Sequence, residues 1–365
     1  MQDKIRVAVL FGGKSAEHEV SLQSAKNVIE AIDKTKYEVV PVGIDKQGHW
    51  LTGDASHFLL NADDPKLIAL NNAGTRVALA PTGDEVHLIP LDEAGPPSPV
   101  DVVFPVLHGP YGEDGTVQGL LKLADVPFVG AGVLGSAVGM DKDVMKRLLR
   151  DAGLPIPAFI TLRRGAGADY DGIIARLGLP CFVKPANLGS SVGISKAKSP
   201  ADLERAVADA FQYDHKVIIE EFIEGREIEC SVLGNGEPMA SVPGEIVPTH
   251  EFYSYEAKYI DENGALLKIP ADLPEPVIKR VQDTAVAAFK ALECEGMARV
   301  DVFLRGDDEV IVNEINTLPG FTRISMYPKL WEASGLSCTE LIDRLIQLAI
   351  ERHARDTKLK TAHEL

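Results

Sequence analysis

The feature that most constrains the fold is a nearly unbroken apolar run near the N-terminus. Residues Ile5 to Phe11 are apolar apart from Arg6, and two glycines follow them directly. A strand without polar alternation is buried on both faces, which is typical of a parallel sheet covered by helices. Ser21 is a suitable helix N-cap, and apolar residues then recur at helical spacing up to Ile32. This segment predicts a strand, a tight turn and a helix, the repeating unit of an α/β domain.

The same alternation continues to about residue 140 and predicts a doubly wound α/β domain. Strands are expected at 37–44 and 101–107, a short helix around 120–124, and a further strand and turn at 128–130. The stretch 45–99 is rich in Asn, Gly, Pro and Asp, so we expect it to be a loop-rich insertion.

A second unit begins at Asp141, which can cap a helix running to Ala152. The following pattern predicts an α+β arrangement in the rest of the chain. Strands are expected at 158–161, 181–184, 217–220, 228–233, 299–304 and 310–316, with helices at 201–211, 275–292 and 338–352.

The composition is that of a soluble globular protein with an acidic excess. Of 365 residues, 54 are Asp or Glu and 37 are Lys or Arg, which gives a net charge of −17. Such a field repels nucleic acid and anionic membranes, so neither is an expected partner. No apolar run is long enough for a signal peptide or a membrane span. The four cysteines are widely spaced, which is typical of reduced thiols, so we expect a cytoplasmic protein.

The glycine turn after the first strand does not match a nucleotide-binding motif. Gly12-Gly13-Lys14-Ser15 lacks the earlier glycine of a phosphate-binding loop, and it is not Gly-x-Gly-x-x-Gly either. Ligands of open α/β sheets bind at the carboxyl ends of strands, however, and Glu17 follows this one. Glu17 is therefore a candidate site residue, with a solvated polar loop as the alternative interpretation.

A lysine and a loop of small residues indicate phosphate chemistry. Lys184 ends an apolar strand, and Gly189-Ser190-Ser191-Val192-Gly193 follows it. Glycines let backbone N–H groups approach phosphate oxygens closely, and Lys184 supplies positive charge. We expect this loop to hold a triphosphate, with a plain hairpin as the alternative.

The apolar run at 217–219 ends in Glu220 and Glu221, and Glu227 comes shortly after. An edge strand of this kind can offer backbone groups to an adenine ring and a carboxylate to a ribose hydroxyl. A charged strand end without a ligand is the commoner meaning of such a pattern.

The strongest candidate site lies near the C-terminus, on two strands whose polar and apolar residues alternate. The turn residues 306–309 separate them, so the two strands should form a hairpin. Glu314 and Asn316 lie on one face of the second strand. Asp301 falls opposite Glu314 if the first and last residues of the turn pair. Two carboxylates and an amide suit Mg²⁺, and the apolar flanks argue against a merely solvent-facing acidic strand.

Two further segments belong with this hairpin. Residues 317–323 contain a Pro-Gly turn and an arginine, which suit a small carboxylate. Residues 252–259 are rich in aromatic side chains and include one lysine, and the polar interleaving favours a mobile lid. An ordinary loop and core packing are the alternatives.

Together these motifs resemble those of the D-alanine–D-alanine ligases, a family of the ATP-grasp superfamily. The resemblance covers nearly the whole chain and rests on residues 11–21, 108–109 with 112–115, 140–142, 184–193, 220–227, 252–259, 296–301 and 313–320. It implies a three-domain ATP-grasp architecture. The N-terminal Rossmann-like substrate domain would span 1–140, the central subdomain with the phosphate loop 141–227, and the C-terminal subdomain with the metal hairpin and lid 228–365.

The resemblance also implies a role for each matched residue. The ATP-binding set would be Lys142, Lys184, Gly189, Ser190, Ser191, Val192, Glu220, Glu221, Ile223, Glu227, Lys258 and Asn313. The D-alanine contacts would be Glu17, His108, Tyr259, Arg299, Gly320, Ser325 and Met326. The catalytic group would be Glu17, Ser190, Arg299, Tyr259 and Ser325. Two Mg²⁺ ions, with Mn²⁺ as a substitute, would be bound by Asp301, Glu314 and Asn316.

The activity implied by the resemblance is ATP-dependent ligation of two D-alanine molecules through a D-alanyl phosphate, for peptidoglycan precursor synthesis, in a cytoplasmic homodimer. Other D-amino-acid or D-lactate ligases remain an alternative, although Tyr259 favours the dipeptide. An NAD-dependent oxidoreductase would need the missing dinucleotide motif. A non-catalytic ATP-binding regulator would have less need of the metal-binding triplet.

Overall fold

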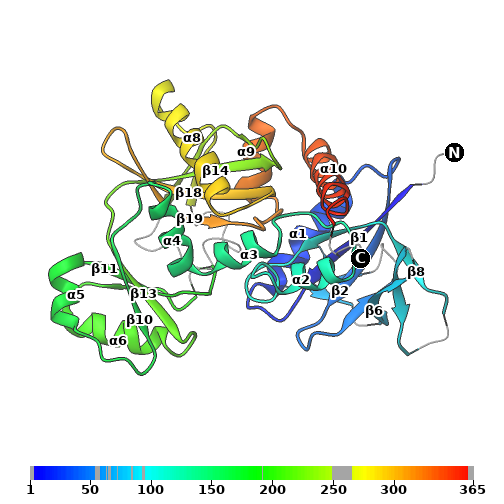
Figure 1. The fold of residues 1–365 in the computed structure, drawn as a ribbon, viewed down its shortest axis with the longest axis horizontal. Coiled ribbons are helices and arrows are strands. Elements are labelled where there is room, and N and C mark those ends of the chain that lie inside the picture. The colour runs from blue at the N-terminus through cyan, green and yellow to red at the C-terminus, as the bar shows by residue number, and fades with distance from the viewer. Residues whose placement is uncertain are drawn as a thin grey trace.

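In the computed structural model, the described residues are 4–53, 58–62, 64, 67–71, 73–83, 85–92, 95–190, 192–248 and 265–360. They form three main sheets with helices packed on and between them (Figure 1). The first sheet lies at the right of Figure 1, the second at the lower left and the third above the centre. Among the described residues, no helix is both long and apolar enough to cross a bilayer.

The first sheet contains the parallel core that the N-terminal pattern predicts. Strand β1 (Ile5–Gly12) lies between β2 (Tyr37–Ile44) and β9 (Val102–Val106), and pairs in parallel with both. Its side chains fill two different core clusters, one on each face of the sheet. Helices α1 (His18–Ala31), α2 (Thr116–Leu123) and α3 (Val133–Met140) follow its strands. At 128–130 the expected strand is reduced to a single bridge between Phe128 and Val103.

The prediction of a loop-rich insertion at 45–99 was wrong. Short antiparallel strands extend the first sheet to seven strands: β3 (Trp50–Thr52), β6 (Thr75–Thr82), β7 (Glu85–Pro90) and β8 (Ser98–Val100). Strands β4 (Leu59–Leu60) and β5 (Ala69–Leu70) form a separate pair. Glycines, asparagines and prolines lie in the turns between these strands. Because turn-forming residues are so frequent here, the sequence did not indicate the short strands between them.

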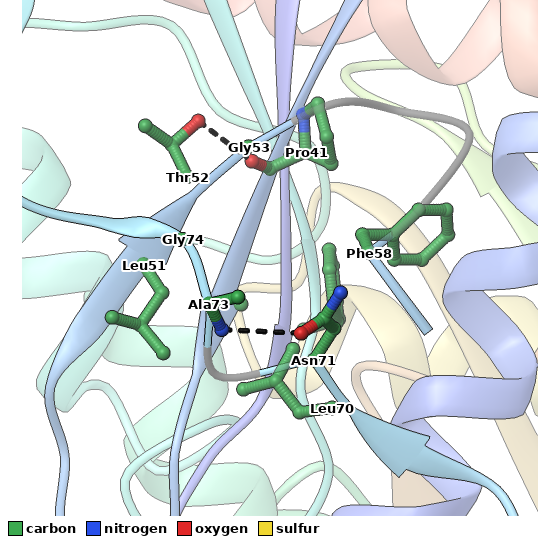
Figure 2. A pocket seen from close by; sticks show the side chains of 11 residues that line it. Pro41, Leu51, Thr52, Gly53, Phe58, Leu70, Asn71, Ala73 and Gly74 are labelled. Carbon is green, nitrogen blue, oxygen red and sulfur yellow. Dashed lines mark hydrogen bonds between the residues drawn. The ribbon is translucent and has the colours of Figure 1, made fainter. Parts of the chain in front are cut away.

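This extension encloses a cavity of about 180 Å³ (Figure 2). Its lining is largely apolar, with Phe11, Leu51 and Leu70 among the residues around it. Among the described lining residues, the polar side chains are engaged: Thr52 donates to the Pro41 carbonyl at 3.0 Å, and Asn71 accepts the Ala73 N–H at 3.1 Å. The cavity therefore presents little polar chemistry.

The second sheet is antiparallel, in the order β10 (Phe159–Arg163), β13 (Lys216–Glu221), β11 (Cys181–Pro185) and β12 (Ser195–Ala197). Helices α5 (Tyr170–Leu177) and α6 (Pro200–Ala210) close its core. The run ending in Glu220 and Glu221 is thus a central strand, not the edge strand predicted. Strand β13 is central because β10 pairs with it on one side and β11 on the other, and nothing in the local sequence indicates the pairing with β10.

The third sheet consists of β14 (Arg226–Gly234), β15 (Met239–Ala240), β16 (Gly244–Pro248), β17 (Ala265–Lys268), β18 (Gly296–Arg305) and β19 (Glu309–Asn316). It packs against α8 (Glu275–Ala291) and α4 (Lys142–Asp151), whose Met145 and Leu149 join the same core. Asp141 caps α4 as predicted.

The C-terminal helices return to the first sheet. Helices α9 (Met326–Ala333) and α10 (Cys338–Asp356) contribute side chains to the core beneath α1. Arg352 of α10 is buried and donates to the carbonyls of Phe128 at 2.7 Å and Gly130 at 2.5 Å. The C-terminal helix therefore fastens the third sheet to the first.

Candidate active site

The first element of the site is the turn that follows β1. Gly12 has a positive φ, and a Cβ there would lie 2.3 Å from the carbonyl oxygen of Ile44, so only glycine fits. Ser21 was predicted as a helix N-cap, but it lies inside α1. Its hydroxyl accepts the Gly12 N–H at 2.7 Å and donates to a carbonyl of β9. Ser21 therefore fixes the turn, and Glu17 occupies the N-cap position.

Glu17 is buried and meets a loop from a distant part of the chain. The hydroxyl of Ser190 donates to Glu17 Oε1. A Cβ on Gly109 would lie 2.6 Å from Glu17 Oε2, and a Cβ on Gly189 would lie 3.3 Å from the same oxygen. Both glycines thus make room for the carboxylate. The structure brings together Glu17, the turn after β9 and the phosphate loop, which we define as residues 189–193.

Glu113 is a site residue that the sequence analysis did not single out. Its Oε1 accepts the Gly109 N–H at 2.9 Å and would lie 3.8 Å from a Cβ on Gly189. Burial raises the pKa of its carboxyl to about 8, and the nearby charge of Glu17 adds to the shift. A protonated carboxyl can therefore stand beside an ionised one here. The only signal in the sequence was an acidic residue in a glycine-bounded turn after a strand.

His108 is buried beside the loop that follows β19. Its Nδ1 donates to the Leu318 carbonyl at 3.0 Å, which leaves Nε2 without the proton and 3.4 Å from the Ser24 hydroxyl. Burial lowers the pKa of the imidazole to about 4, so it is neutral at pH 7. Ser24 also accepts the N–H of Phe321 at 3.1 Å, so the first and third sheets meet at this histidine.

Ser325 and Gly320 lie next to each other in the same region. A Cβ on Gly320 would lie 2.8 Å from Ser325 Oγ. That hydroxyl accepts the Thr322 N–H at 3.0 Å. Met326 follows at the start of α9, and its side chain is buried in a small cluster with Ile246. The loop after β19 is therefore a compact turn.

A buried cluster of lysines and one carboxylate forms the floor of the central part. Lys184 Nζ lies 2.8 Å from Glu220 Oε2, and Lys146 Nζ lies 3.3 Å from Glu220 Oε1. The two lysines hold the pKa of Glu220 below its ordinary value although burial opposes this. Burial lowers the pKa of Lys146. Sequence analysis missed Lys146, although it lies one helical turn after Lys142 on α4.

Lys142 joins this cluster to the phosphate loop and to the hairpin. Its Nζ donates to the Leu188 carbonyl at 2.6 Å and lies 3.8 Å from Glu314 Oε2. Lys142 is itself buried. It therefore presents a positive charge between the loop and the expected metal ligands.

The other expected nucleotide contacts surround the end of β13. Glu220 turns its side chain to the two lysines, Glu221 accepts the Ala158 N–H at 2.7 Å, and Ile223 is buried. Glu227 lies on β14 opposite Phe303. Because the side chains of Glu220 and Glu221 are engaged, an adenine here would meet backbone groups of this segment.

The hairpin of β18 and β19 has the predicted pairing at Asp301, but a different pairing at the turn. Asp301 lies opposite Glu314, as predicted, but Arg305 and not Gly306 pairs with Glu309 at the turn. A bulge between Asp301 and Val302 restores the register, with Asn313 as the extra residue. The Asn313 carbonyl accepts from Lys146 Nζ at 3.3 Å, while its Oδ1 is buried without a hydrogen bond.

Arg299 ties the acidic residues of the third sheet together. Its guanidinium donates to both oxygens of Asp301 at 2.7 Å and lies 3.0 Å from Glu229 Oε2. Arg299 pairs across the hairpin with Asn316. The described residues hold no cluster of three His, Cys, Asp or Glu side chains that fits a metal ion. The donor set here is two carboxylates and an amide on one face, which are oxygen ligands that suit Mg²⁺.

Three of the expected residues cannot be placed. Ser191, Lys258 and Tyr259 lie outside the described residues, as does the whole lid segment 252–259. The roles expected for these residues therefore stay predictions.

Known proteins resemble this chain over nearly its whole length. The family model described as "D-ala D-ala ligase N-terminus" matches residues 6–131, and "D-ala D-ala ligase C-terminus" matches 148–347. A D-alanine–D-alanine ligase of Oceanobacillus iheyensis is 57% identical over 361 residues, 98% of this chain and 99% of that one.

Solved structures show the same similarity. The D-alanine–D-alanine ligase of Coxiella burnetii has a TM-score of 0.85 and 42% identity, covering 97% of this chain and 96% of its own. The Bacillus anthracis enzyme, complexed with ATP, has a TM-score of 0.72 and 28% identity, covering 96% and 99%. These neighbours have the ATP-grasp fold.

Proposed function

The chain belongs to the D-alanine–D-alanine ligase family, and on that premise we propose that it joins two D-alanine molecules to D-alanyl-D-alanine. The reaction consumes ATP, releases ADP and phosphate, and serves peptidoglycan precursor synthesis. The observation that carries the proposal is the contact between Glu17 and Ser190. It joins a carboxylate suited to an ammonium group to a loop suited to a γ-phosphate.

The chemistry requires these two groups to be neighbours. A carboxylate is a poor acyl donor, so the γ-phosphoryl group is first transferred to the first D-alanine to form an acyl phosphate. The free amine of the second D-alanine then attacks the acyl carbon, and phosphate leaves. Positive charge stabilises the transferring group, and a closed site protects the acyl phosphate from water.

The chain's own residues supply the ATP contacts. Lys142 and Lys184 neutralise the phosphates, and the loop residues Gly189, Ser190, Ser191 and Val192 cover the γ-phosphate. Backbone groups from Glu220 to Ile223 hold the adenine, and Glu227 binds the ribose. Support comes from the buried lysine cluster and from the distance of 2.6 Å between Lys142 Nζ and the Leu188 carbonyl at the loop.

The D-alanine contacts come from the first and third sheets. Glu17 holds the ammonium of the first D-alanine near His108. Arg299 and Gly320 steady the reacting carboxyl, and Ser325, beside Met326, faces the carboxylate of the second substrate. The imidazole of His108 is neutral, so it neither repels the ammonium nor competes with it for the carboxylate of Glu17.

The metal ligands of the proposal are Asp301, Glu314 and Asn316, which would bind Mg²⁺ or Mn²⁺. Their oxygen donors and their cross-strand arrangement fit such ions. Bound metal supplies neutralisation of the phosphate charge. Arg299 donates to both oxygens of Asp301 and orients this carboxylate, which would share its remaining lone pairs with the ion.

The assembly and location are also proposals. We expect a homodimer, because exposed leucines gather on α2 and α3: Leu120, Leu123 and Leu134. We expect a cytoplasmic enzyme, because ATP is the co-substrate and because burial raises the pKa of the Cys230 and Cys294 thiols to about 12, which suits reduced core cysteines. The division of the chain into three domains, at 1–140, 141–227 and 228–365, is likewise a proposal.

The test is release of phosphate from ATP and Mg²⁺ with D-alanine, L-alanine, or D-alanine plus D-lactate, with the products identified by mass. We expect D-alanyl-D-alanine from D-alanine alone. Asp301→Asn and Glu314→Gln should each lower kcat about a hundredfold or more, because each removes a ligand charge at the phosphate.

Glu309→Gln is the matched control, since it removes a carboxylate from the exposed end of the same hairpin. It should leave kcat unchanged. No phosphate release dependent on D-alanine would refute the ligase proposal, and a D-lactate product in excess over the dipeptide would shift the assignment to the depsipeptide ligases.

A further inference from the structure

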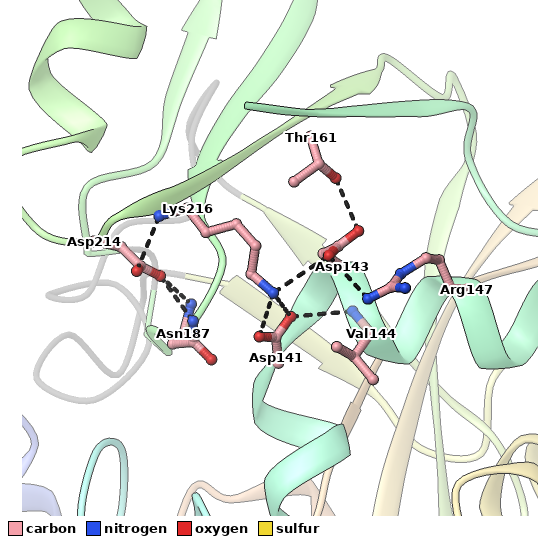
Figure 3. A network of polar contacts seen from close by, with 8 residues as sticks. All are labelled: Asp141, Asp143, Val144, Arg147, Thr161, Asn187, Asp214 and Lys216. Atoms are coloured by element: carbon pink, nitrogen blue, oxygen red, sulfur yellow. Dashed lines mark hydrogen bonds and ion pairs between the residues drawn. The ribbon is translucent and has the colours of Figure 1, made fainter. Parts of the chain in front are cut away.

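A buried group of charges joins α4 to the second sheet (Figure 3). Lys216, at the start of β13, is only 8% exposed, and its Nζ donates to both oxygens of Asp141 at 2.6 and 2.5 Å. The same Nζ lies 3.3 Å from Asp143 Oδ2. Asp141 caps α4, the helix that carries Lys142. This group therefore attaches the start of that helix to the sheet.

Backbone hydrogen bonds continue the same connection. The N–H of Lys142 donates to the Ala186 carbonyl at 3.0 Å, and the N–H of Ala186 donates to the Lys216 carbonyl at 3.0 Å. The strand that leads into the phosphate loop is thus held between the helix start and β13. Hydrogen bonds therefore connect Lys142 directly to the stem of the loop.

Asp214 holds the beginning of the phosphate loop directly. Its Oδ2 accepts both the backbone N–H and the side-chain amide of Asn187, each at 2.9 Å. Its Oδ1 accepts the N–H of Lys216 at 3.1 Å. At the other end of the loop, a Cβ on Gly193 would lie 2.8 Å from Tyr213, so this end also rests on the turn before β13.

Stability alone is a poor reason for such an arrangement. Burying an ion pair costs desolvation that its attraction only just repays, whereas it does select one geometry. Here the geometry selected is that of Lys142 relative to the phosphate loop. Asn187 lies two residues before Gly189, so Asp214 acts directly on the start of the loop.

We propose that Asp214 and Lys216 are positioning residues for ATP, which set the phosphate loop and Lys142 at the spacing that the triphosphate requires. The inference rests on the proposed function, in which Lys142 and this loop hold the phosphates. It assigns a role to two residues that touch neither substrate nor metal.

The experiment compares Asp214→Ala with Asp169→Ala. Asp169 caps α5 in the same part of the chain, with Oδ1 accepting the Gly172 N–H at 3.0 Å, and among the described residues no hydrogen bond or ion pair joins it to the loop. Both variants lose a structural carboxylate, so both should lower the Tm. Only Asp214→Ala should raise the KM for ATP, by roughly tenfold, with the KM for D-alanine changed less than about twofold.

The conservative variant Asp214→Asn keeps a carbonyl oxygen that accepts from Asn187, so it should restore most of the ATP affinity. Asn187→Ala removes one of the two bonds and should give an intermediate KM for ATP, which keeps the test open if Asp214→Ala fails to fold. Equal KM values for ATP in Asp214→Ala and Asp169→Ala, or in Asn187→Ala and the wild type, would overturn the inference. Calorimetric titration with Mg·ATP measures the same affinity without turnover, so the inference stays testable even if the wild type makes no dipeptide.

Discussion

At the scale of single residues, the site is defined by how burial shifts the pKa values of neighbouring ionisable groups. Glu113 is driven toward its protonated form beside Glu17, while His108 is driven toward its neutral form. Glu220 stays ionised in an equally buried place because two lysines face its two oxygens. The charge of each group is therefore set by its nearest partners, and not by burial alone.

The lowered pKa of His108 should make the free energy of unfolding depend on pH. Its pKa is lowered from 6.5 to about 4 in the folded state, so the unfolded chain binds a proton that the native protein excludes between these values. The stabilisation is present at pH 7 and is lost as the pH falls toward 4. Between pH 7 and pH 5 this group should cost about 2 kcal/mol of unfolding free energy.

The measurement is urea unfolding of the wild type and His108→Gln at both pH values. The difference between pH 7 and pH 5 should shrink by about 2 kcal/mol in the variant. His215→Gln, at an exposed position, should leave the difference as it is in the wild type. An unchanged difference in His108→Gln would show that the imidazole is not desolvated.

At the scale of elements, helix ends and strand irregularities place the functional groups. Asp141 starts α4 where Lys142 is needed, and the bulge at Asn313 keeps Glu314 facing Asp301. A regular hairpin from the same turn would have paired Asp301 with Asn313 and turned Glu314 into the apolar core. The bulge is therefore part of the site.

Helix α10 offers a stability test that does not touch the site. Ser337 and Glu340 form a capping box at its start, with Ser337 Oγ accepting the Glu340 N–H at 3.3 Å and Glu340 Oε2 accepting the Ser337 N–H at 2.9 Å. Ser337→Ala should lower the unfolding free energy by about 1 kcal/mol. The values of kcat and both KM should not change.

Thermal unfolding and steady-state kinetics of the same preparation check both parts of this prediction. The matched variant Ser337→Thr keeps a hydroxyl acceptor and should retain most of the stability. A loss of activity without a loss of stability would mean that the start of α10 acts on the site.

At the scale of the whole molecule, three exposed leucines lie on two neighbouring helices. Leu123 is 87% exposed on α2, and Leu120 and Leu134 lie exposed on the same pair of neighbouring helices (Figure 1). Exposed apolar patches of this kind are typical of interfaces between subunits. The net charge of −17 would otherwise keep copies of the chain apart.

Leu123→Asp should therefore convert the expected homodimer to a monomer, measured by sedimentation velocity. The introduced charge would be buried in an interface between two copies, at a cost of several kcal/mol. Leu359→Asp is the control, because Leu359 is 68% exposed beyond the end of α10. A monomeric wild type, or a dimer that survives Leu123→Asp, would contradict the proposed interface.

Much of this protein could be predicted from local patterns alone. The apolar run at Ile5–Phe11, the Asp141 cap and the alternation around Asp301 and Glu314 each depend on neighbours in sequence. The strands and helices they predict are present within a few residues. The insertion at 45–99 was misjudged because turn residues outnumber the short strands between them.

Adjacent residues were enough to predict the set of elements and the chemical character of their ends, because burial period and capping are local properties. The contacts of Glu17 with Ser190, of Lys146 with Glu220 and of Asp214 with Asn187 could be found only from the three-dimensional structure. Sheet order and the register shift at the bulge also came from it. These features depend on which segments that are distant in the sequence pack together. A charged side chain that is buried by this packing needs an ionic or hydrogen-bonding partner, and the fold supplies it from a distant segment.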